Sequence, residues 1–306
     1  MKAKTLQLGD TIGIIAPSRP MRPYEKEIYQ GIENLKKMGF KIKLGKNLDQ
    51  QFYYSAGTPE QKANDLNEMF ADAEVQAIIC ATGGSSANQI LELIDYDLVK
   101  NNPKIFLGYS DITTLLLALN AKTGLVTFHG PDAYEFSHIT KEAQDFFLSL
   151  TAGKAGTYSY PKKMRVLKAG KAEGALLGGN LSILNALIEG EYAPDFDGAI
   201  LFWEETNLSP AMLDCKLHEL KIAGVLARIS GMVIGHLSEC VDKKYPEDNR
   251  PIDEIVLAVT KQYDFPIIQV DYFGHDITNF YTIPIGTKAR IDTEKMEFKL
   301  LDAPVE

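Results

Sequence analysis

Cysteine is scarce in this sequence, and long apolar runs are missing from it. The three cysteines, Cys80, Cys215 and Cys240, lie far apart and have no CxxC spacing, which argues against a disulfide framework and a zinc knuckle. No run approaches the roughly 18 apolar residues of a membrane-spanning helix. The residues before the first apolar strand are too few for the core of a secretory signal. We therefore expect a cytoplasmic protein that contacts no membrane.

An excess of positive charge is also absent. The chain has 32 Lys and Arg residues against 41 Asp and Glu residues, a formal net charge of −9. Such a balance gives no general attraction to phosphate backbones, so we expect no nucleic-acid partner. The 306 residues, 45% hydrophobic and 24% charged, suffice for one large or two ordinary folded domains.

Motifs for metal ions and cofactors are missing as well. The histidines and acidic residues show no HExxH or facial-triad spacing. The paired glycines Gly83 and Gly84 belong to neither a GxGxxG nor a Gly-Lys-Ser/Thr phosphate loop. We expect neither a metal nor a cofactor.

The first half of the chain alternates short apolar runs with amphipathic segments. Thr58 and Pro59 supply an N-cap and a proline at the first position of one predicted helix. Alternating strands and helices indicate a mostly parallel sheet, in which functional residues follow the carboxyl ends of the strands. The pattern predicts strands over 11–16, 40–44, 75–81 and 104–107, and helices over 24–38, 59–71 and 88–94.

The pattern breaks over 153–172, a stretch containing Gly, Lys and Pro that we interpret as a linker. We therefore predict an N-terminal α/β domain over 1–152 and a smaller C-terminal α/β domain over 173–306. In the second half, strands are predicted over 199–203, 229–234, 267–270, 289–291 and 298–300, and helices over 210–223 and 253–262.

The sharpest local feature is Ser110, in the run from Lys104 to Leu117. An apolar strand ends at Gly108, and an apolar helix begins within a few residues. A serine at such a corner exposes its hydroxyl at the sheet edge, and the helix N-terminus beyond it directs backbone N–H groups at an oxyanion. The alternative is that Ser110 only caps the helix. The GxSxG pattern of ordinary α/β-hydrolases is incomplete here, because its second glycine is missing.

A second strand end, that of the predicted strand 75–81, is followed by Gly83 and Gly84. Glycine permits close backbone approach, so the N–H of Gly84 is a candidate donor to an oxyanion. A tight turn without function fits this segment equally well.

A serine nucleophile needs a base, and the chain has five histidines. His275 follows an apolar strand and stands next to Gly274, while His129 also follows a strand and competes with it. His218 lies within a predicted helix and His236 beside a glycine, and a partly buried, hydrogen-bonded histidine without catalytic function is the alternative at both positions. Position alone leaves His275 and His129 open.

An acid that orients the base can come from the strand end at Glu204 and Glu205. Two adjacent residues of an extended chain point to opposite sides, so only one of these carboxylates faces a given cleft. A solvated strand end is the alternative.

Taken together in their order along the chain, these segments resemble the LD-carboxypeptidase family of serine peptidases, which includes muramoyltetrapeptide carboxypeptidases and microcin C self-immunity peptidases. The resemblance covers nearly the whole chain. Its segments are Gly9 to Ser18, Ser55 to Thr58, Gly83-Gly84, Gly108 to Asp111, Thr127 to Pro131, Gly178 to Ser182, Glu204, Gly274-His275 and Ile283 to Gly286.

The resemblance implies a Ser-His-Glu triad with Ser110 as nucleophile, His275 as base and Glu204 as orienting acid. It also implies an oxyanion hole formed by the backbone N–H groups of Gly84 and Asp111. The implied fold is an amidotransferase-like parallel-sheet domain followed by a smaller β-rich α/β domain. The implied assembly is a homodimer.

The activity implied by the resemblance is removal of the terminal D-alanine from murein tetrapeptides in peptidoglycan recycling. The substrate would be a small peptide with a free C-terminal carboxylate. Thr82 and Ser85-Ser86 depart from the murein branch around the paired glycines. Residues 86–88 and 94–104 are closer to the microcin-immunity branch, whose members cleave peptidyl or aminoacyl sulfamoyl adenylates, whereas the short segment from 158 to 173 is unlike that branch. A non-catalytic binder of peptides or nucleotides is a third hypothesis.

Overall fold

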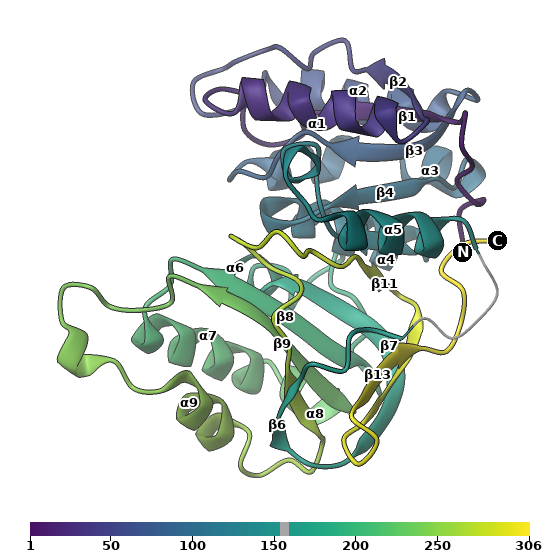
Figure 1. Ribbon diagram of the computed structural model, residues 1–306. Helices are drawn as coiled ribbons and strands as arrows, with labels where there is room; N and C mark the ends of the chain where they lie inside the picture. Colours follow the sequence, from purple (N-terminus) through teal and green to yellow (C-terminus); the bar gives the residue numbers. More distant parts are fainter. Residues whose placement is uncertain (154–158) are drawn as a thin grey trace. The chain divides into compact units, whose positions relative to one another are not determined.

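The computed structural model describes residues 1–153 and 159–306, which divide into two compact units (Figure 1). Of these residues, the first unit contains 1–153, 278–286 and 303–306, and the second contains 159–277 and 287–302. Each unit has one mixed sheet, which confirms the predicted α/β fold in two domains. In the part of the chain described, none of the helices combines the length and apolar character needed to cross a bilayer.

The first sheet has the strand order β11-β5-β4-β3-β1-β2. Neighbouring strands are parallel except β11, which runs antiparallel to β5. The apolar residues of the inner strands are fully buried, so these strands form the core of the unit. The strands are β1 (Thr11–Ile15), β2 (Lys41–Leu44), β3 (Val75–Cys80), β4 (Ile105–Gly108), β5 (Thr127–His129) and β11 (Ile283–Ile285).

Helices cover this sheet in two groups. Helices α2, α3 and α4 contact one another in sequence, whereas α1 packs against the short turn η3 (Figure 1). Thr58 and Gln61 form the capping box that starts α2, as the Thr-Pro signal predicts. The helices are α1 (Glu25–Lys37), α2 (Pro59–Ala71), α3 (Tyr96–Asn101), α4 (Thr113–Thr123) and α5 (Lys141–Thr151), with 3-10 turns η1 (Ala87–Leu93), η2 (Ser110–Ile112) and η3 (Glu135–Ser137).

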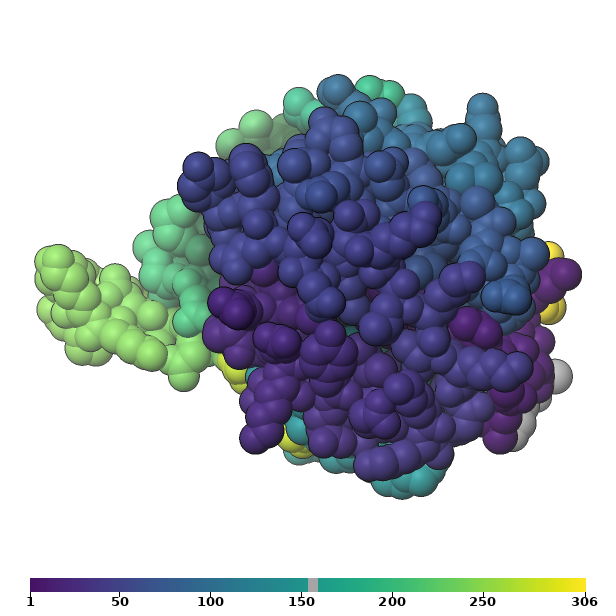
Figure 2. Space-filling model, turned by 90° about the horizontal axis from the view of Figure 1, so that it is seen from above, coloured from purple at the N-terminus to yellow at the C-terminus, as the bar shows by residue number. Residues whose placement is uncertain are grey.

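Figure 2 shows the surface of the early residues of the first unit, coloured purple to blue. Three aromatic side chains of one loop, Phe52, Tyr53 and Tyr54, are exposed in this unit.

The predicted helix over 88–94 is a 3-10 helix in the structure, because the chain turns again at the α3 cap, Asp95.

The second sheet has the order β13-β12-β7-β8-β9-β10-β6. Its four central strands, β7 to β10, are parallel, and the outer strands pair antiparallel with them or with each other. The strands are β6 (Arg165–Lys168), β7 (Lys171–Asn180), β8 (Ile200–Thr206), β9 (Gly231–Ser238), β10 (Ile267–Gln269), β12 (Lys288–Asp292) and β13 (Glu297–Leu300).

Helix α7 contacts each of the other three α-helices of the second unit (Figure 1). Its N-terminus has the same chemistry as that of α2, because the Ser209 hydroxyl accepts a hydrogen bond from the Met212 N–H and Pro210 occupies the first helical position. The helices are α6 (Leu181–Asn185), α7 (Pro210–Ile222), α8 (Val225–Arg228) and α9 (Ile252–Val259), with the 3-10 turn η4 (Pro246–Asp248).

Two parts of the predicted domain division differ from the structure. The predicted linker over 153–172 contains strand β6 and the start of β7, because β6 pairs with β10 and forms the edge of the second sheet. Residues 154–158 of that linker lie outside the described residues. The predicted C-terminal domain over 173–306 includes 278–286, which the structure places in the first unit because β11 pairs with β5.

Candidate active site

Ser110 follows β4 directly and begins the turn η2, which leads into α4. Its backbone φ is 59°, a left-handed conformation that costs a residue with a side chain roughly 1–2 kcal/mol. Gly108 makes the sharp turn possible, because a Cβ atom there would lie 2.9 Å from the Ile112 side chain. A strained, non-glycine residue at a strand-to-helix corner is the backbone arrangement expected of an exposed nucleophile.

The structure does not support the alternative in which Ser110 merely caps a helix. Tyr109 is the N-cap of η2 and Ile112 is the N-cap of α4, and neither position has a side-chain cap. Ser110 is instead the first residue inside η2. Its hydroxyl is therefore not at the capping position that its residue type suggested.

The loop of Gly83 and Gly84 lies directly against Ser110. A Cβ atom on Gly83 would lie 2.9 Å from the Ser110 Cβ, 3.1 Å from its Oγ and 3.6 Å from the Asp111 nitrogen. Gly84 has a φ of 152°, and a Cβ there would overlap Ser18 and Arg19. Only glycines allow this loop to approach the serine and the N–H of Asp111 so closely. The structure thus brings three predicted residues, Gly84, Ser110 and Asp111, into one region of the first unit.

The buried side chain of Asp111 holds this loop in place. Its Oδ2 accepts hydrogen bonds from the backbone N–H groups of Ser86 and Ala87, both at 2.8 Å, and from the Ser18 hydroxyl at 2.5 Å. Hydrogen bonds to an ionised carboxylate are stronger than those between neutral groups. The residue after the serine therefore fixes the loop that follows β3.

A buried lysine, which the sequence analysis missed, holds the same loop from its other side. Lys62 of α2 is 1% exposed, and its Nζ donates to the Ser86 carbonyl at 2.8 Å, the Ser86 hydroxyl at 3.1 Å and Gln89 Oε1 at 2.9 Å. Burial lowers the pKa of Lys62 to about 8, although the nearby Asp111 carboxylate opposes this effect. The signal in the sequence was its spacing, since Lys62 lies on the face of α2 that also buries Leu66.

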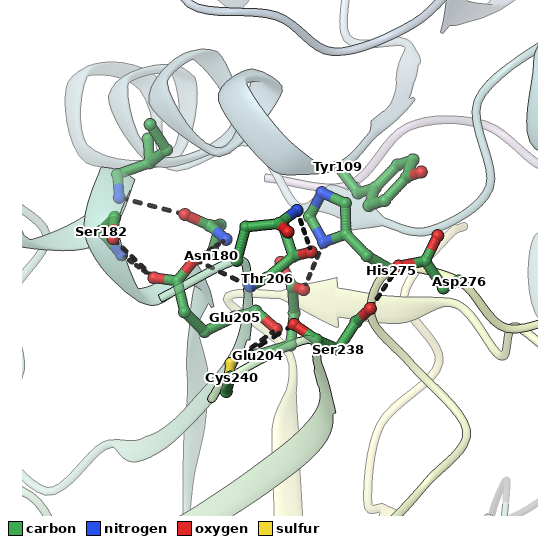
Figure 3. Close-up of polar contacts among 12 residues, drawn as sticks. Tyr109, Asn180, Ser182, Glu204, Glu205, Thr206, Ser238, Cys240, His275 and Asp276 are labelled. Atoms are coloured by element: carbon green, nitrogen blue, oxygen red, sulfur yellow. Dashed lines mark hydrogen bonds and ion pairs between the residues drawn. The ribbon is translucent and has the colours of Figure 1, made fainter. Parts of the chain in front are cut away.

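In the second unit, His275 and Glu204 form a close pair (Figure 3). His275 Nδ1 lies 2.6 Å from Glu204 Oε2, and the Glu204 side chain is completely buried. Glu204 comes from β8, and His275 from the loop that follows β10. The structure therefore brings together the predicted base and the predicted acid, which are 71 residues apart in the sequence.

The charge of Glu204 controls the protonation of His275. Burial of the imidazole lowers its pKa, but the charge and hydrogen bond of Glu204 outweigh this effect, with smaller contributions from Glu205 and Asp276. The net result raises the pKa of His275 to about 8. An imidazole held through Nδ1 by a carboxylate has the tautomer and the basicity of a general base.

Gly274 lets the loop that carries His275 approach the strand that carries Glu204. Gly274 has a φ of 131°, and a Cβ on it would lie 3.2 Å from the Glu204 Cβ and 2.9 Å from the His236 carbonyl oxygen. The pairing of β8 with β9 shifts register between Trp203 and Glu205, so β9 has one more residue than β8 beside Glu204. Such bulges redirect side chains at strand ends.

Glu205 points away from Glu204, as expected for neighbours on a strand. Its carboxylate accepts hydrogen bonds from the Asn180 side chain at 3.1 Å and from both the backbone N–H and the hydroxyl of Ser182, at 2.9 and 2.6 Å (Figure 3). It also accepts one from the Thr206 N–H at 2.9 Å. Glu205 therefore stabilises the start of α6, while Glu204 is the acid paired with histidine.

The structure gives the other histidines different environments. His129 is completely buried in β5 and contacts the rings of Tyr109 and Phe280. His218 is half-exposed in α7, with Nδ1 3.0 Å from the Asp214 carbonyl oxygen. Within the described ranges, no group of three or more His, Cys, Asp or Glu side chains is arranged to hold a metal ion.

The class of protein follows from comparison with known families. A model of the LD-carboxypeptidase N-terminal domain matches residues 12–130, and a model of the LD-carboxypeptidase C-terminal domain matches residues 173–291. Together they cover more than half of the chain. The chain belongs to the LD-carboxypeptidase family of peptidases, which confirms the resemblance found in the sequence.

Two curated relatives show which members of the family the chain is similar to. A probable murein peptide carboxypeptidase of Bacillus subtilis (strain 168) is 35% identical over 301 residues, covering 95% of this chain and 92% of the relative. The microcin C7 self-immunity protein MccF of Escherichia coli is 30% identical over 339 residues, covering 98% of this chain and 95% of the relative. Both similarities extend over nearly the full length of each protein.

Solved structures give the same picture. The structure of MccF in complex with glutamyl sulfamoyl guanosine aligns with a TM-score of 0.91 and 27% sequence identity, covering 100% of this chain and 99% of that one. An MccF-like protein from Bacillus anthracis str. Ames aligns with a TM-score of 0.87 and 28% identity, covering 99% of each chain.

Proposed function

We propose that this protein is a serine-type L,D-carboxypeptidase that removes the terminal D-alanine from murein tetrapeptides during cytoplasmic peptidoglycan recycling. The observation that carries the proposal is the pairing of His275 with the buried Glu204, with 2.6 Å between Oε2 and Nδ1. The left-handed φ of Ser110, beside the paired glycines, supports its assignment as the nucleophile. The murein peptide relative, 35% identical, supports the substrate class.

In the proposed mechanism, Ser110, His275 and Glu204 act as a triad. Because Glu204 binds Nδ1, Nε2 of His275 is the nitrogen that removes the proton from Ser110 as its oxygen attacks the scissile carbonyl. The same proton then passes to the nitrogen of D-alanine, which leaves as the C–N bond breaks. Water, deprotonated by His275, hydrolyses the acyl-enzyme and releases the tripeptide.

The charge that develops on the carbonyl oxygen also needs a partner. We assign this role to the backbone N–H groups of Gly84 and Asp111, the second of which belongs to the residue directly after the nucleophile. Loss of one such donor typically reduces kcat by about 10²–10³-fold. The hydrogen bonds from Ser86 and Ala87 to Asp111 support this assignment, because they restrict the movement of the loop.

Cleavage of aminoacyl or peptidyl sulfamoyl adenylates, the microcin-immunity activity, is the second candidate function. It is favoured by the 30% identity to the MccF immunity protein and by the TM-score of 0.91 with that protein bound to a sulfamoyl nucleoside. The same Ser110 acyl-enzyme chemistry would apply.

A homodimer, implied by the family resemblance, is part of the proposal and is checked by sedimentation velocity.

The deciding experiment supplies both substrates to the wild type and to Ser110→Ala. Mass spectrometry follows D-alanine release from L-Ala-D-Glu-meso-diaminopimelate-D-Ala and hydrolysis of aspartyl sulfamoyl adenosine. We expect tetrapeptide cleavage by the wild type and by Ser149→Ala, a control on α5, and none by Ser110→Ala. Exclusive cleavage of the sulfamoyl compound selects the second function. Binding without cleavage of either compound selects the non-catalytic alternative.

A further inference from the structure

Arg19 lies beside the loop that we assign to the oxyanion hole. Its backbone N–H donates to the Gly83 carbonyl at 3.3 Å. A Cβ atom on Gly84 would lie 2.7 Å from the Arg19 nitrogen and 2.9 Å from the Arg19 Cβ. The preceding residue, Ser18, is completely buried and hydrogen-bonded to Asp111. The backbone of Arg19 is thus attached to the same loop that contacts Ser110.

The Arg19 side chain rests on an aromatic surface. The guanidinium carbon lies 5.5 Å from the centre of the Tyr24 ring, and Tyr24 packs edge-on against Tyr134 at 5.1 Å. Tyr134 is itself fixed at the carboxyl end of β3, because its N–H donates to the Ala81 carbonyl at 3.1 Å. Ring contacts of this kind orient a guanidinium without neutralising its charge.

The charge of Arg19 is not balanced within the described part of the chain. Its side chain is half-buried, and no carboxylate of those residues lies within ion-pair distance of it. Arg22 likewise has no ion-pair partner among the described residues, but it is exposed. The other four arginines of the sequence all form ion pairs with acidic side chains: Arg165, Arg228, Arg250 and Arg290.

We infer that Arg19 binds the free carboxylate of the residue that the enzyme releases. This inference rests on the proposed function and identifies the group that makes the enzyme a carboxypeptidase. One residue of peptide spans at most about 3.6 Å, so the terminal carboxylate of a D-alanine leaving group lies close to the scissile bond. The group that recognises it must therefore be next to the nucleophile, and a guanidinium matches a carboxylate with two parallel hydrogen bonds.

The test compares two forms of one substrate. The tetrapeptide is supplied with a free C-terminal carboxylate and as its C-terminal amide, and kcat/KM is measured for the wild type, Arg19→Ala, Arg19→Lys and Arg22→Ala. For the acid, we expect Arg19→Ala to lose roughly ten- to hundredfold in kcat/KM, the range expected for lost charged hydrogen bonds. For the amide, we expect Arg19→Ala to match the wild type. Arg19→Lys should recover part of the loss, and Arg22→Ala should show none.

Other outcomes separate this inference from the proposed function. Equal losses on the acid and the amide would show that Arg19 acts on the loop rather than on the carboxylate. Unchanged kinetics in Arg19→Ala would also overturn the inference. In both cases wild-type cleavage of the acid leaves the proposed function standing, whereas a wild type that cleaves neither form overturns the proposed function itself.

Discussion

Ser110 combines a reactive hydroxyl with an unfavourable backbone conformation, and its φ of 59° suits glycine better than serine. We expect Ser110→Ala and Ser110→Gly both to lose roughly 10³-fold or more in kcat/KM. Ser110→Gly should have the higher free energy of unfolding, by about 1 kcal/mol, because glycine adopts this φ without strain. Urea denaturation of the two variants measures the difference. If Ser110→Ala is the more stable of the two, the left-handed φ at position 110 does not strain a residue that has a side chain.

His275 should make the activity strongly dependent on pH. Its pKa is raised to about 8, and only the neutral imidazole can accept a proton. Below that pH, kcat/KM should fall about tenfold per pH unit, and it should reach a plateau above the pKa. A pH profile from 5.5 to 9.5 measures this dependence. A profile that is flat between pH 6 and 8 would contradict the assignment of His275 as the base.

The cause of this shift can be tested separately. Glu204→Gln removes the charge that raises the pKa of His275 and leaves the burial that lowers it. The midpoint of the pH profile should therefore move to lower pH while the plateau falls. Glu205→Gln is the matched control, since the Glu205 carboxylate binds Asn180 and Ser182 instead of His275. This variant should shift the midpoint less, because Glu205 contributes less than Glu204 to the pKa of His275. Equal shifts in the two variants would argue against the Glu204 assignment.

Among the elements, α2 has a role beyond covering the sheet, because Lys62 connects it to the loop after β3. Lys62→Met would leave the Ser86 carbonyl and Gln89 without their donor. We expect a free energy of unfolding lower by about 1–3 kcal/mol. We also expect kcat to decrease by up to about tenfold, because small displacements of a catalytic loop reduce the rate. Equilibrium unfolding and steady-state kinetics measure the two effects.

Lys46→Met is the control for this variant. Lys46 forms an ion pair with Glu68 of α2, but the Lys46 side chain is 74% exposed. Exposed substitutions usually change stability by no more than about 0.5 kcal/mol, so both parameters should stay near wild type. A Lys62→Met protein that behaves like this control would show that the buried amine does not hold the loop.

The elements that the sequence predicted well are those with strong local signals. Strand β1 and helix α2 begin where the apolar run and the Thr58-Pro59 cap place them. Strand β6 is predicted as linker because its segment contains Gly, Lys and Pro and lacks periodicity. Its strand character comes from pairing with β10, about 100 residues away, which no local pattern records.

The same distinction applies to the site. Ser110 and the opposite directions of Glu204 and Glu205 follow from local geometry, whereas the choice of His275 over His129 needed the family resemblance. Lys62 and Arg19 contact the loop after β3, at residues distant from them in the sequence. Neither has a local motif, so the structure was needed to reveal them.

At the scale of the whole molecule, the last residues of the chain return to the first unit. Val305 is buried and forms a β-bridge with Ala3. The Thr5 N–H donates to the Glu306 backbone carbonyl at 3.0 Å, and the Glu306 N–H donates to the Ala3 carbonyl at 2.9 Å. Deletion of residues 303–306 should lower the free energy of unfolding by about 2–3 kcal/mol, from lost apolar burial and hydrogen bonds. Urea denaturation tests this, with the exposed Asp302→Ala as the control. An unchanged midpoint in the deletion variant would contradict it.

Strand β11 has a consequence for how the protein is made. It completes the sheet that carries Ser110, yet about 150 residues separate it from its partner β5. At 5–20 residues per second, a ribosome needs roughly 8–30 seconds to add them. During that interval the nascent chain holds an unfinished sheet whose outer strand, β5, has no neighbour on one side. The first unit is therefore begun before the second unit and completed after most of it, so its folding cannot end before β11 has been synthesised.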